Sequence, residues 1–149
     1  MSEYRAITVK SSSFLEQIKT NVKLTTDSSD IVPTKEWIAL WDTGANHTCI
    51  TDKIINEYNL KPNGRSFVTT ANGTVETESF IVSVWLPNGV VIPDIDVYRI
   101  SLDPSLDLVI GMDIILYGDF AITNKDGKTT FSFRYPSVEE IDFVKEYNF

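Results

Sequence analysis

The sequence predicts a single domain that is mostly β, with two or three short helices. Apolar and polar residues alternate in several short runs, which is typical of half-buried strands. Turn signals separate these runs at Asn72-Gly73, at Pro87–Gly89 and at Lys125–Lys128. The chain has 149 residues, 42% apolar and 23% charged, which is the size and composition of one globular domain.

The first third of the chain predicts three strands. Tyr4–Val9 alternates weakly, and Ile18–Thr26 alternates clearly. The polar stretch Asp27–Glu36, which contains Pro33, predicts the loop of a hairpin. The apolar run Trp37–Trp41 then predicts a buried strand.

The period changes after this strand, which predicts a short helix. Thr51 is a suitable N-cap, and Ile54, Ile55 and Tyr58 share one helical face. Pro62 lies just beyond the expected end of the helix.

The next part of the chain returns to strands. A hairpin is predicted from Ser66 to Leu86, followed by a strand over Val90–Ile100. The apolar run Leu108–Ile110 ends at a glycine, and a short helix is expected from Asp113. A last alternating strand is predicted over Thr129–Tyr135.

The C-terminal residues have the pattern of a helix. Ser137 and Glu140 have the spacing of a capping box, and Val138, Ile141 and Val144 share one helical face. We therefore divide the chain into a domain over residues 1–135 and a C-terminal helical tail over residues 136–149. The apolar face of this tail packs either on its own domain or on a partner.

Charge and cysteine content narrow the classes of partner. The net charge of −8 argues against nucleic acid or an anionic membrane as a partner, because both need clustered Lys and Arg. The N-terminus lacks the apolar core of a signal peptide, and no apolar run approaches a membrane span. We therefore expect a cytoplasmic protein with no membrane partner.

Cys49 and His47 are the chain's only cysteine and only histidine. A single cysteine excludes an internal disulfide. On an extended segment the two side chains would point to the same face, as a catalytic Cys/His pair requires. We favour the simpler interpretation that Cys49 is a small buried apolar residue.

A carboxylate at the end of an apolar strand has a known chemical use. Two carboxylates about 3 Å apart share one proton, so one acts as base and the other as acid on a water molecule. Asp42 directly follows Trp37–Trp41 and is the candidate catalytic residue. Thr43, Gly44 and Ala45 would support it, through a hydroxyl and through little steric bulk. Such chemistry needs no metal or cofactor, and we expect none.

Three stretches in order resemble retropepsin-like aspartic proteases. "WDTGANHTCI" resembles the active-site loop of that family, and "TTANGTVET" resembles the flap hairpin that closes over a bound peptide. Leu108–Ile114 is similar to the second signature of the family, two apolar residues and Gly before a short helix. The resemblance covers roughly Phe14 to Phe133, and its first and third stretches are the specific ones.

The resemblance implies a closed β-barrel of the acid protease fold and an aspartic endopeptidase. Because the chain has one Asp-Thr-Gly, Asp42 would meet Asp42 of a second copy in a homodimer, and the substrate would be a peptide or protein. The remaining substrate-binding residues would be Asn46 and His47 in the active-site loop and Ala71, Asn72, Gly73 and Thr74 at the flap tip. Asp113 would be a residue of the helix N-terminus and not a second catalytic group.

Two departures place the chain nearer to cellular and bacterial members than to retroviral ones. Retroviral members often pair an Arg after the second signature with an acidic residue after the Asp-Thr-Gly-Ala. Here Asp113 lies near the first position and Asn46-His47 occupy the second, so that ion pair is absent. The terminal strands that lock retroviral dimers are not evident either, and a C-terminal helical segment is expected in their place.

Two alternatives remain on the same fold. One is a dimeric module that binds peptides in the cleft without cleaving them, and the other is a latent protease domain that needs a further partner. A dimeric protease loses specific activity on dilution, whereas a binding module has no activity to lose.

Overall fold

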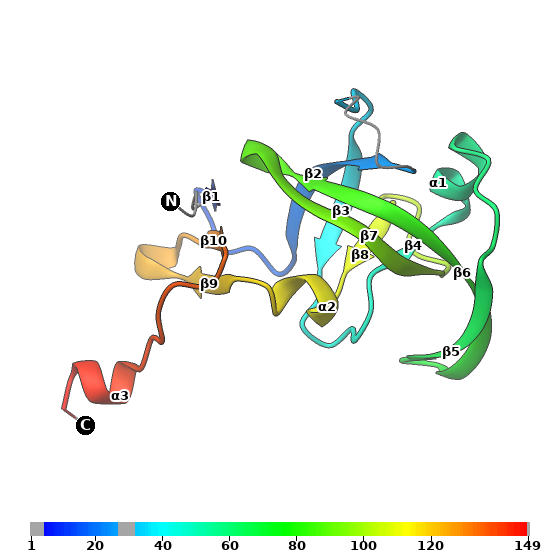
Figure 1. Ribbon diagram of the computed structural model, residues 1–149. Helices are drawn as coiled ribbons and strands as arrows, with labels where there is room; N and C mark the ends of the chain where they lie inside the picture. The colour runs from blue at the N-terminus through cyan, green and yellow to red at the C-terminus, as the bar shows by residue number, and fades with distance from the viewer. Residues whose placement is uncertain (1–4, 27–31, 149) are drawn as a thin grey trace.

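The computed structural model describes residues 5–26 and 32–148, so Tyr4 and part of the predicted loop after the second strand lie outside the described residues. The main sheet has seven strands, in the order β2-β3-β8-β4-β7-β6-β5 (Figure 1). Their bounds are β2 (Ile18–Thr25), β3 (Trp37–Trp41), β4 (Cys49–Ile50), β5 (Gly64–Thr70), β6 (Gly73–Leu86), β7 (Val90–Arg99) and β8 (Leu108–Ile110).

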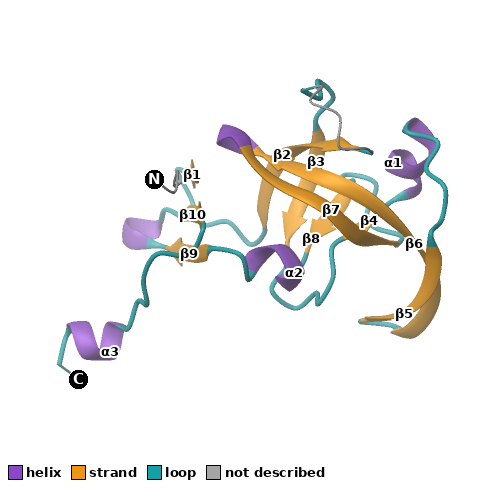
Figure 2. Ribbon diagram, in the orientation of Figure 1, coloured by secondary structure: helices purple, strands orange, loops and turns teal. Residues whose placement is uncertain are grey.

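A smaller sheet and a few short helices complete the described chain (Figure 2). The small sheet has the order β1-β10-β9, with β1 (Arg5–Lys10), β9 (Asp119–Thr123) and β10 (Thr130–Tyr135). The helices are α1 (Asp52–Glu57), α2 (Met112–Ile115), α3 (Phe143–Glu146) and the 3-10 turns η1 (Pro87–Gly89) and η2 (Lys125–Gly127). None of the helices in the described ranges is long and apolar enough to cross a membrane.

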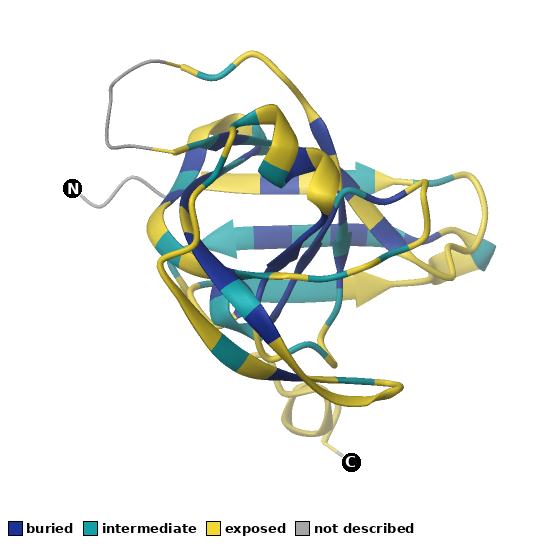
Figure 3. Cartoon of the chain, turned by 90° about the vertical axis from the view of Figure 1, so that its right-hand side faces the viewer, coloured by how far each residue is buried: buried dark blue, intermediate teal, exposed yellow. Residues whose placement is uncertain are grey.

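The main sheet closes on itself through a second pairing of β2. Besides β3, β2 pairs with β6 from Lys23↔Trp85 to Thr25↔Ser83. Six strands therefore form a ring, and β5 extends β6 outside it. Buried residues line the inner side of this ring (Figure 3). The prediction of a mostly β fold with a few short helices is confirmed.

Alternation in the sequence explains how the ring fills its interior. In β2 the side chains of Ile18, Thr20, Val22 and Leu24 are buried while their neighbours are wholly or partly exposed, because successive residues of a strand point to opposite faces. The indole N–H of Trp41 donates a hydrogen bond of 2.8 Å to the buried Thr20 hydroxyl. This strand pair therefore has its one buried polar side chain satisfied.

Aromatic packing attaches the small sheet to the strand that precedes the Asp-Thr-Gly. The Trp41 ring lies 5.0 Å from the Phe131 ring and 5.1 Å from the Phe133 ring, centroid to centroid. Both phenylalanines belong to β10 and are almost completely buried. Pairs of this geometry stabilise beyond their buried area, so the small sheet fixes the end of β3.

Most of the predicted strands are present, with shifts at their boundaries. The hairpin turn consists of Ala71 and Asn72, because Thr70 pairs with Gly73, so it lies one residue before the Asn72-Gly73 that signalled it. Thr51 does take the N-cap position of α1, but its hydroxyl donates to the Asp107 carbonyl instead of capping the helix. The sequence did not predict β4 or β9.

The ends of the chain differ from expectation. β1 pairs with β10 within the chain, in register Arg5↔Tyr135, so the predicted first strand is present, and the expected lack of dimer-locking terminal strands stays a prediction. The predicted capping box at Ser137 is wrong, because the Ser137 hydroxyl donates to Asp119 and the helix starts later. Asp142 is the N-cap of α3. The described tail residues after Pro136 are exposed and lead away from the ring (Figure 1), and the division at residue 135 stays a prediction.

Asp119 anchors the start of the tail to β9. Hydrogen bonds from the Ser137 hydroxyl, the Val138 N–H and the Arg134 guanidinium hold the pKa of its carboxyl well below the usual range. Because the folded-state pKa is lowered, the stabilisation is present above the unfolded-state pKa of about 4 and is lost as the pH falls through the folded-state value.

We therefore expect Asp119→Asn to lower the free energy of unfolding at neutral pH. The difference from the parent protein should shrink as the pH falls below about 4, where the unfolded carboxyl becomes protonated. Urea titrations of both proteins across this pH range measure the difference. A difference that stays constant with pH would contradict the assignment.

Candidate active site

Asp42 lies directly after the end of β3, at the rim of the ring. β3 and β8 run parallel, with Trp41 opposite Ile110, and the Asp42 N–H donates to the Ile110 carbonyl at 2.9 Å. Trp41 and Ile110 are buried, whereas Asp42 is half-buried. The core strands thus deliver a carboxylate to the surface on a rigid mount, as predicted.

The Asp-Thr-Gly forms a tight turn around its own carboxylate. The Gly44 N–H donates to Asp42 Oδ1 at 2.8 Å, and the Ala45 N–H donates to the Asp42 carbonyl at 3.1 Å. A Cβ on Gly44 would lie 3.1 Å from Asp42 Oδ1, so a larger residue would crowd this oxygen. Thr43 and Gly44 are exposed, which leaves the turn open to a substrate or to a second chain.

The residues after β8 contact the backbone of the loop that follows Asp42. The Met112 N–H donates to the Ala45 carbonyl at 2.7 Å. Gly111 packs so closely that a Cβ there would lie 2.7 Å from the carbonyl carbon and oxygen of His47 and 2.8 Å from the Ala45 oxygen. The second signature of the resemblance therefore has a steric role: only glycine fits beneath the loop.

Asp113 and Thr48 form a second contact between the same segments. The Thr48 N–H and hydroxyl donate to the two oxygens of Asp113 at 2.8 and 2.7 Å. The Thr48 hydroxyl in turn accepts from the Gly111 N–H at 3.3 Å. These bonds connect the same two segments that the Arg–carboxylate ion pair described above for retroviral members would join. Asp113 is in the first turn of α2, as expected, but sequence reasoning missed its bond to Thr48 because no local signal links residues 65 positions apart.

His47 and Cys49 do not form a catalytic pair. His47 is exposed, with its ring centroid 5.0 Å from that of Tyr98, whereas Cys49 is buried in β4. Burial, with the negative charges of Asp113 and Asp42, raises the pKa of the Cys49 thiol to about 12. The thiolate is thus disfavoured, and the interpretation of Cys49 as a buried apolar residue is confirmed. The chain at His47 is bent and not extended, so the geometry assumed for such a pair is absent.

The tip of hairpin β5–β6 carries the other predicted binding residues. Ala71, Asn72, Gly73 and Thr74 are all exposed, and Gly73 has a φ of 112°, which favours glycine. The Thr70 hydroxyl donates to the Gly73 carbonyl at 3.0 Å and accepts from the Asn72 N–H at 3.2 Å, which stiffens the turn. Figure 1 shows the hairpin curling away from the ring on the side where β3 ends.

Two hollows border these elements. One of about 340 Å³ lies beside Asp42, between the start of β2, β3 and β9, and its walls include Leu40, Thr43, Phe120 and Ile122. The other, of about 420 Å³, lies under hairpin β5–β6. They share no lining residue. A larger hollow between β1 and β2 contains none of the predicted site residues.

The described residues contain no group of His, Cys, Asp or Glu side chains arranged to hold a metal ion. The chemistry available at the site is that of an exposed Asp-Thr-Gly turn on a rigid strand, next to a hollow.

Sequence comparison decides the family. Residues 32–116, more than half of the chain, match the family described as "gag-polyprotein putative aspartyl protease". The chain belongs to the retropepsin-like aspartyl protease family. The matched segment contains the Asp-Thr-Gly, the hairpin and the Gly111 segment beneath the loop. No curated protein matches the chain.

One solved structure supports the fold of this retropepsin-like protein, and two others are more distantly similar. It is similar to a retropepsin-like aspartic protease from Rickettsia conorii, with a TM-score of 0.55 and 13% identity over 89% of this chain and 96% of that one. The simian foamy virus (mac) protease has a TM-score of 0.45 and 12% identity over 64% and 89% of the two chains. The retroviral protease-like domain of Ddi1 from Leishmania major has a TM-score of 0.42 and 20% identity over 83% and 96%.

Proposed function

We propose that this protein is an aspartic endopeptidase that acts as a homodimer, with its catalytic dyad formed by Asp42 of two copies. The observation that carries the proposal is the Asp42 turn itself. Its carboxylate is oriented by the Gly44 N–H at 2.8 Å, at the surface end of a buried strand, in a chain that has one Asp-Thr-Gly. Membership of an aspartyl protease family supports the reaction class.

In this proposal the second carboxylate comes from another chain. Asp113, which is also close to Cys49, has both oxygens bonded to Thr48 and is not available to face Asp42. A two-fold axis beside Asp42 would bring the same residue of the partner opposite it. The exposed Thr43 and Gly44 leave room for that approach.

The paired carboxylates supply the acid–base chemistry of peptide hydrolysis. Close to each other they share one proton, since both cannot be charged at that distance. The charged one takes a proton from a water molecule, whose oxygen attacks the peptide carbonyl carbon, and the protonated one gives its proton to the carbonyl oxygen. The tetrahedral intermediate then collapses: the carboxyl that took the water's proton gives it to the leaving amine, and the other carboxylate takes a proton from a diol hydroxyl as the new carboxyl group forms. The dyad again holds one proton. The hairpin residues 71–74 and the loop residues Asn46 and His47 would bind the extended peptide backbone.

The outer edge of β9 is the surface we propose for the partner. Within the described ranges β9 pairs with β10 alone, so its other edge is open to strand pairing. Its residues Phe120 and Ile122 line the hollow beside Asp42, and Ile122 is exposed. Exposed Leu116 and Tyr117 at the end of α2 lie just before β9 in the chain and add apolar surface. Pairing there would cover this surface and bring the two Asp42 turns together.

A dilution series tests the proposal. The protein is incubated with a diverse peptide mixture between about pH 4 and 7, and cleavage is read by mass spectrometry while sedimentation measures the fraction of dimer. We expect specific activity to fall in parallel with the dimer fraction, since a monomer carries half of the dyad. Dimers that retain peptides without cleaving them would instead support a binding module. A monomer without activity would support a latent domain.

A further inference from the structure

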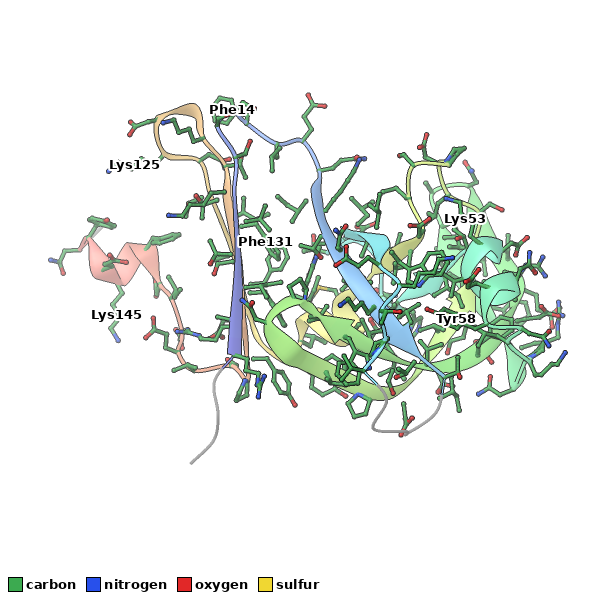
Figure 4. The ribbon with its side chains drawn as sticks, turned by 90° about the horizontal axis from the view of Figure 1, so that it is seen from above. Phe14, Lys53, Tyr58, Lys125, Phe131 and Lys145 are labelled. Carbon is green, nitrogen blue, oxygen red and sulfur yellow. The ribbon has the colours of Figure 1, made fainter. Side chains whose placement is uncertain are left out.

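The first turn of α1 contacts both ends of the segment Arg99–Asp107, which connects β7 to β8. Asp52 contacts the start of this segment and Lys53 contacts its end. In Figure 4, Lys53 lies on α1 beside the loop that follows β7. Two consecutive residues with opposite charges thus hold a connection that has no regular secondary structure from Ile100 to Asp107. We call Asp52, Lys53 and Arg99 the clamp.

Arg99 connects α1 to the base of the flap hairpin. Its guanidinium is bidentate on Asp52, with Nε to Oδ1 at 2.7 Å and Nη2 to Oδ2 at 3.0 Å. Its Nη1 also donates to Glu78 of β6 at 3.3 Å, and its carbonyl accepts from the Thr77 hydroxyl at 2.9 Å. A planar guanidinium fixes the direction as well as the distance of its partners. The start of the segment is therefore oriented relative to β6.

Lys53 fixes the other end of the segment with all three of its donors. Its Nζ donates to the Pro104 carbonyl at 2.7 Å, to the Leu106 carbonyl at 3.2 Å and to Asp107 Oδ1 at 2.8 Å. An ammonium has three N–H groups, so this group is saturated. Asp107 is itself fixed, because its Oδ2 accepts from the Ile38 N–H at 2.8 Å. The end of the segment is thereby tied to β3, the strand that carries Asp42.

The clamped segment and the flap hairpin form opposite walls of the 420 Å³ hollow. The hairpin contributes Val68, Thr70, Asn72, Val75 and Thr77, and the other wall consists of Arg99, Ile100 and Ser101. Val68 and Val75 are directly opposite each other in the hairpin, so they lie on the same face. Together with Ile100 they give the hollow an aliphatic lining around a few polar groups. An apolar side chain of moderate size has the chemistry that matches it.

Stability alone does not account for these contacts. The Asp52 and Arg99 side chains are about half exposed, at 57% and 47%, and exposed ion pairs contribute little to the free energy of unfolding. We expect these contacts to act mainly on geometry, because they fix the position of one wall of the hollow relative to the other.

We propose that Asp52, Lys53 and Arg99 are positioning residues that set the width of the hollow under the flap, and so select an aliphatic substrate side chain over a larger one. The proposal rests on the proposed function, because it treats the hollow as part of the peptide cleft. It assigns these residues no contact with the reacting atoms. Their effect passes through residues 99–107 to the substrate.

The test separates binding from cleavage. The peptides share a sequence that the parent protein binds and differ at one position, which is Ala, Val, Leu or Phe. Their affinities are measured on Asp42→Asn protein, in which binding is read without cleavage. The variants compared are Lys53→Met, Arg99→Lys and the control Lys61→Met. Lys61 is an exposed residue just after α1 and contacts Asn59 instead of the segment.

We expect Lys53→Met and Arg99→Lys to weaken binding of the best aliphatic peptide roughly tenfold, the size of one lost charge-assisted hydrogen bond. Binding of the Phe peptide should change less, so the ratio of the affinity for the best aliphatic peptide to that for the Phe peptide should fall. In protein that keeps Asp42, and so can cleave, the same substitutions should raise KM with little change in kcat. They should also speed up amide hydrogen exchange of residues 100–107. Lys53→Arg, which keeps the charge and the donors, should restore part of the preference.

An unchanged preference in folded Lys53→Met and Arg99→Lys would overturn the proposal, and so would a parent protein that binds none of the peptides. If one variant does not fold, the other carries the test. A parent that binds the series with the expected preference but cleaves nothing would contradict the proposed function and leave the clamp supported.

Discussion

Replacing Asp42 by Asn is expected to reduce peptide cleavage by roughly 10²–10⁴-fold, the range for loss of a general acid–base group. The amide has the shape of the carboxyl group but cannot share a proton with a partner. Its oxygen can still accept the Gly44 N–H that now bonds to Asp42 Oδ1, so the turn should keep its conformation. Initial rates on a cleaved peptide measure the loss, and thermal unfolding checks that the fold is intact.

A mixing experiment sharpens this prediction. If each site needs two Asp42 residues, an equimolar mixture with the variant that has exchanged subunits should retain about a quarter of the activity of the same total amount of parent protein. A site made within one chain would retain about half. Asp126→Asn, in the exposed turn η2, is the matched control and should leave the rate unchanged. Persistent cleavage by Asp42→Asn would move the catalytic carboxylate elsewhere.

Gly111→Ala is expected to have the second largest effect, because it acts on the support of the Asp42 loop. The new methyl group would lie 2.7–2.8 Å from backbone atoms of His47 and Ala45, and backbone cannot turn aside as a side chain can. We expect a loss of about 1–3 kcal/mol in the free energy of unfolding, as for other overpacked sites. A shift of the loop by about 1 Å would further cost on the order of 10²-fold in kcat. Urea unfolding and steady-state rates measure the two effects.

Gly64→Ala in β5 is the matched control for this substitution. There Gly64 is exposed, and the methyl group would approach a side-chain atom, the hydroxyl oxygen of Ser79 in β6, at 3.3 Å. We therefore expect a smaller change in stability. If Gly111→Ala protein had the stability and rate of the parent, the loop would tolerate movement. That result would contradict the steric role that we assign to Gly111.

Much of the fold could be predicted because the signals are local. The alternation in β2 matches its burial residue by residue from Ile18 to Leu24, since one face of this strand fills the ring. The apolar run Trp37–Trp41 and the turn at Pro87–Gly89 were also recognisable without tertiary information.

The missed elements depend on partners far along the chain. β4 has two residues and exists because Cys49 and Ile50 fit between β7 and β8; no periodicity is visible in two residues. β9 is a strand because β10 pairs with it. Ser137 has the spacing of a capping residue, but the Asp119 carboxylate takes its hydroxyl and Asp142 starts the helix instead. A hydrogen bond to a charged acceptor that folding brings close is stronger than the helix cap that the local pattern predicts.

The candidate site divides in the same way. The Asp42 turn could be located from the sequence, because the strand, the Asp and the Gly are consecutive. The Thr48–Asp113 bonds and the fit of Gly111 under His47 join segments that meet only in the folded chain. Predicting that these residues matter was within reach of the resemblance, whereas predicting what they contact was not.

The pairing of β1 with β10 has a consequence for how the protein matures. Thr8 and Ser132 lie side by side although they are 124 residues apart, and contacts between such distant residues form slowly. During translation β1 is made well before its partner β10. Phe131 and Phe133, which pack on Trp41 next to Asp42, arrive with that late strand. We therefore expect a nascent chain to hold β3, and Asp42 at its end, without this aromatic support until β10 has been made.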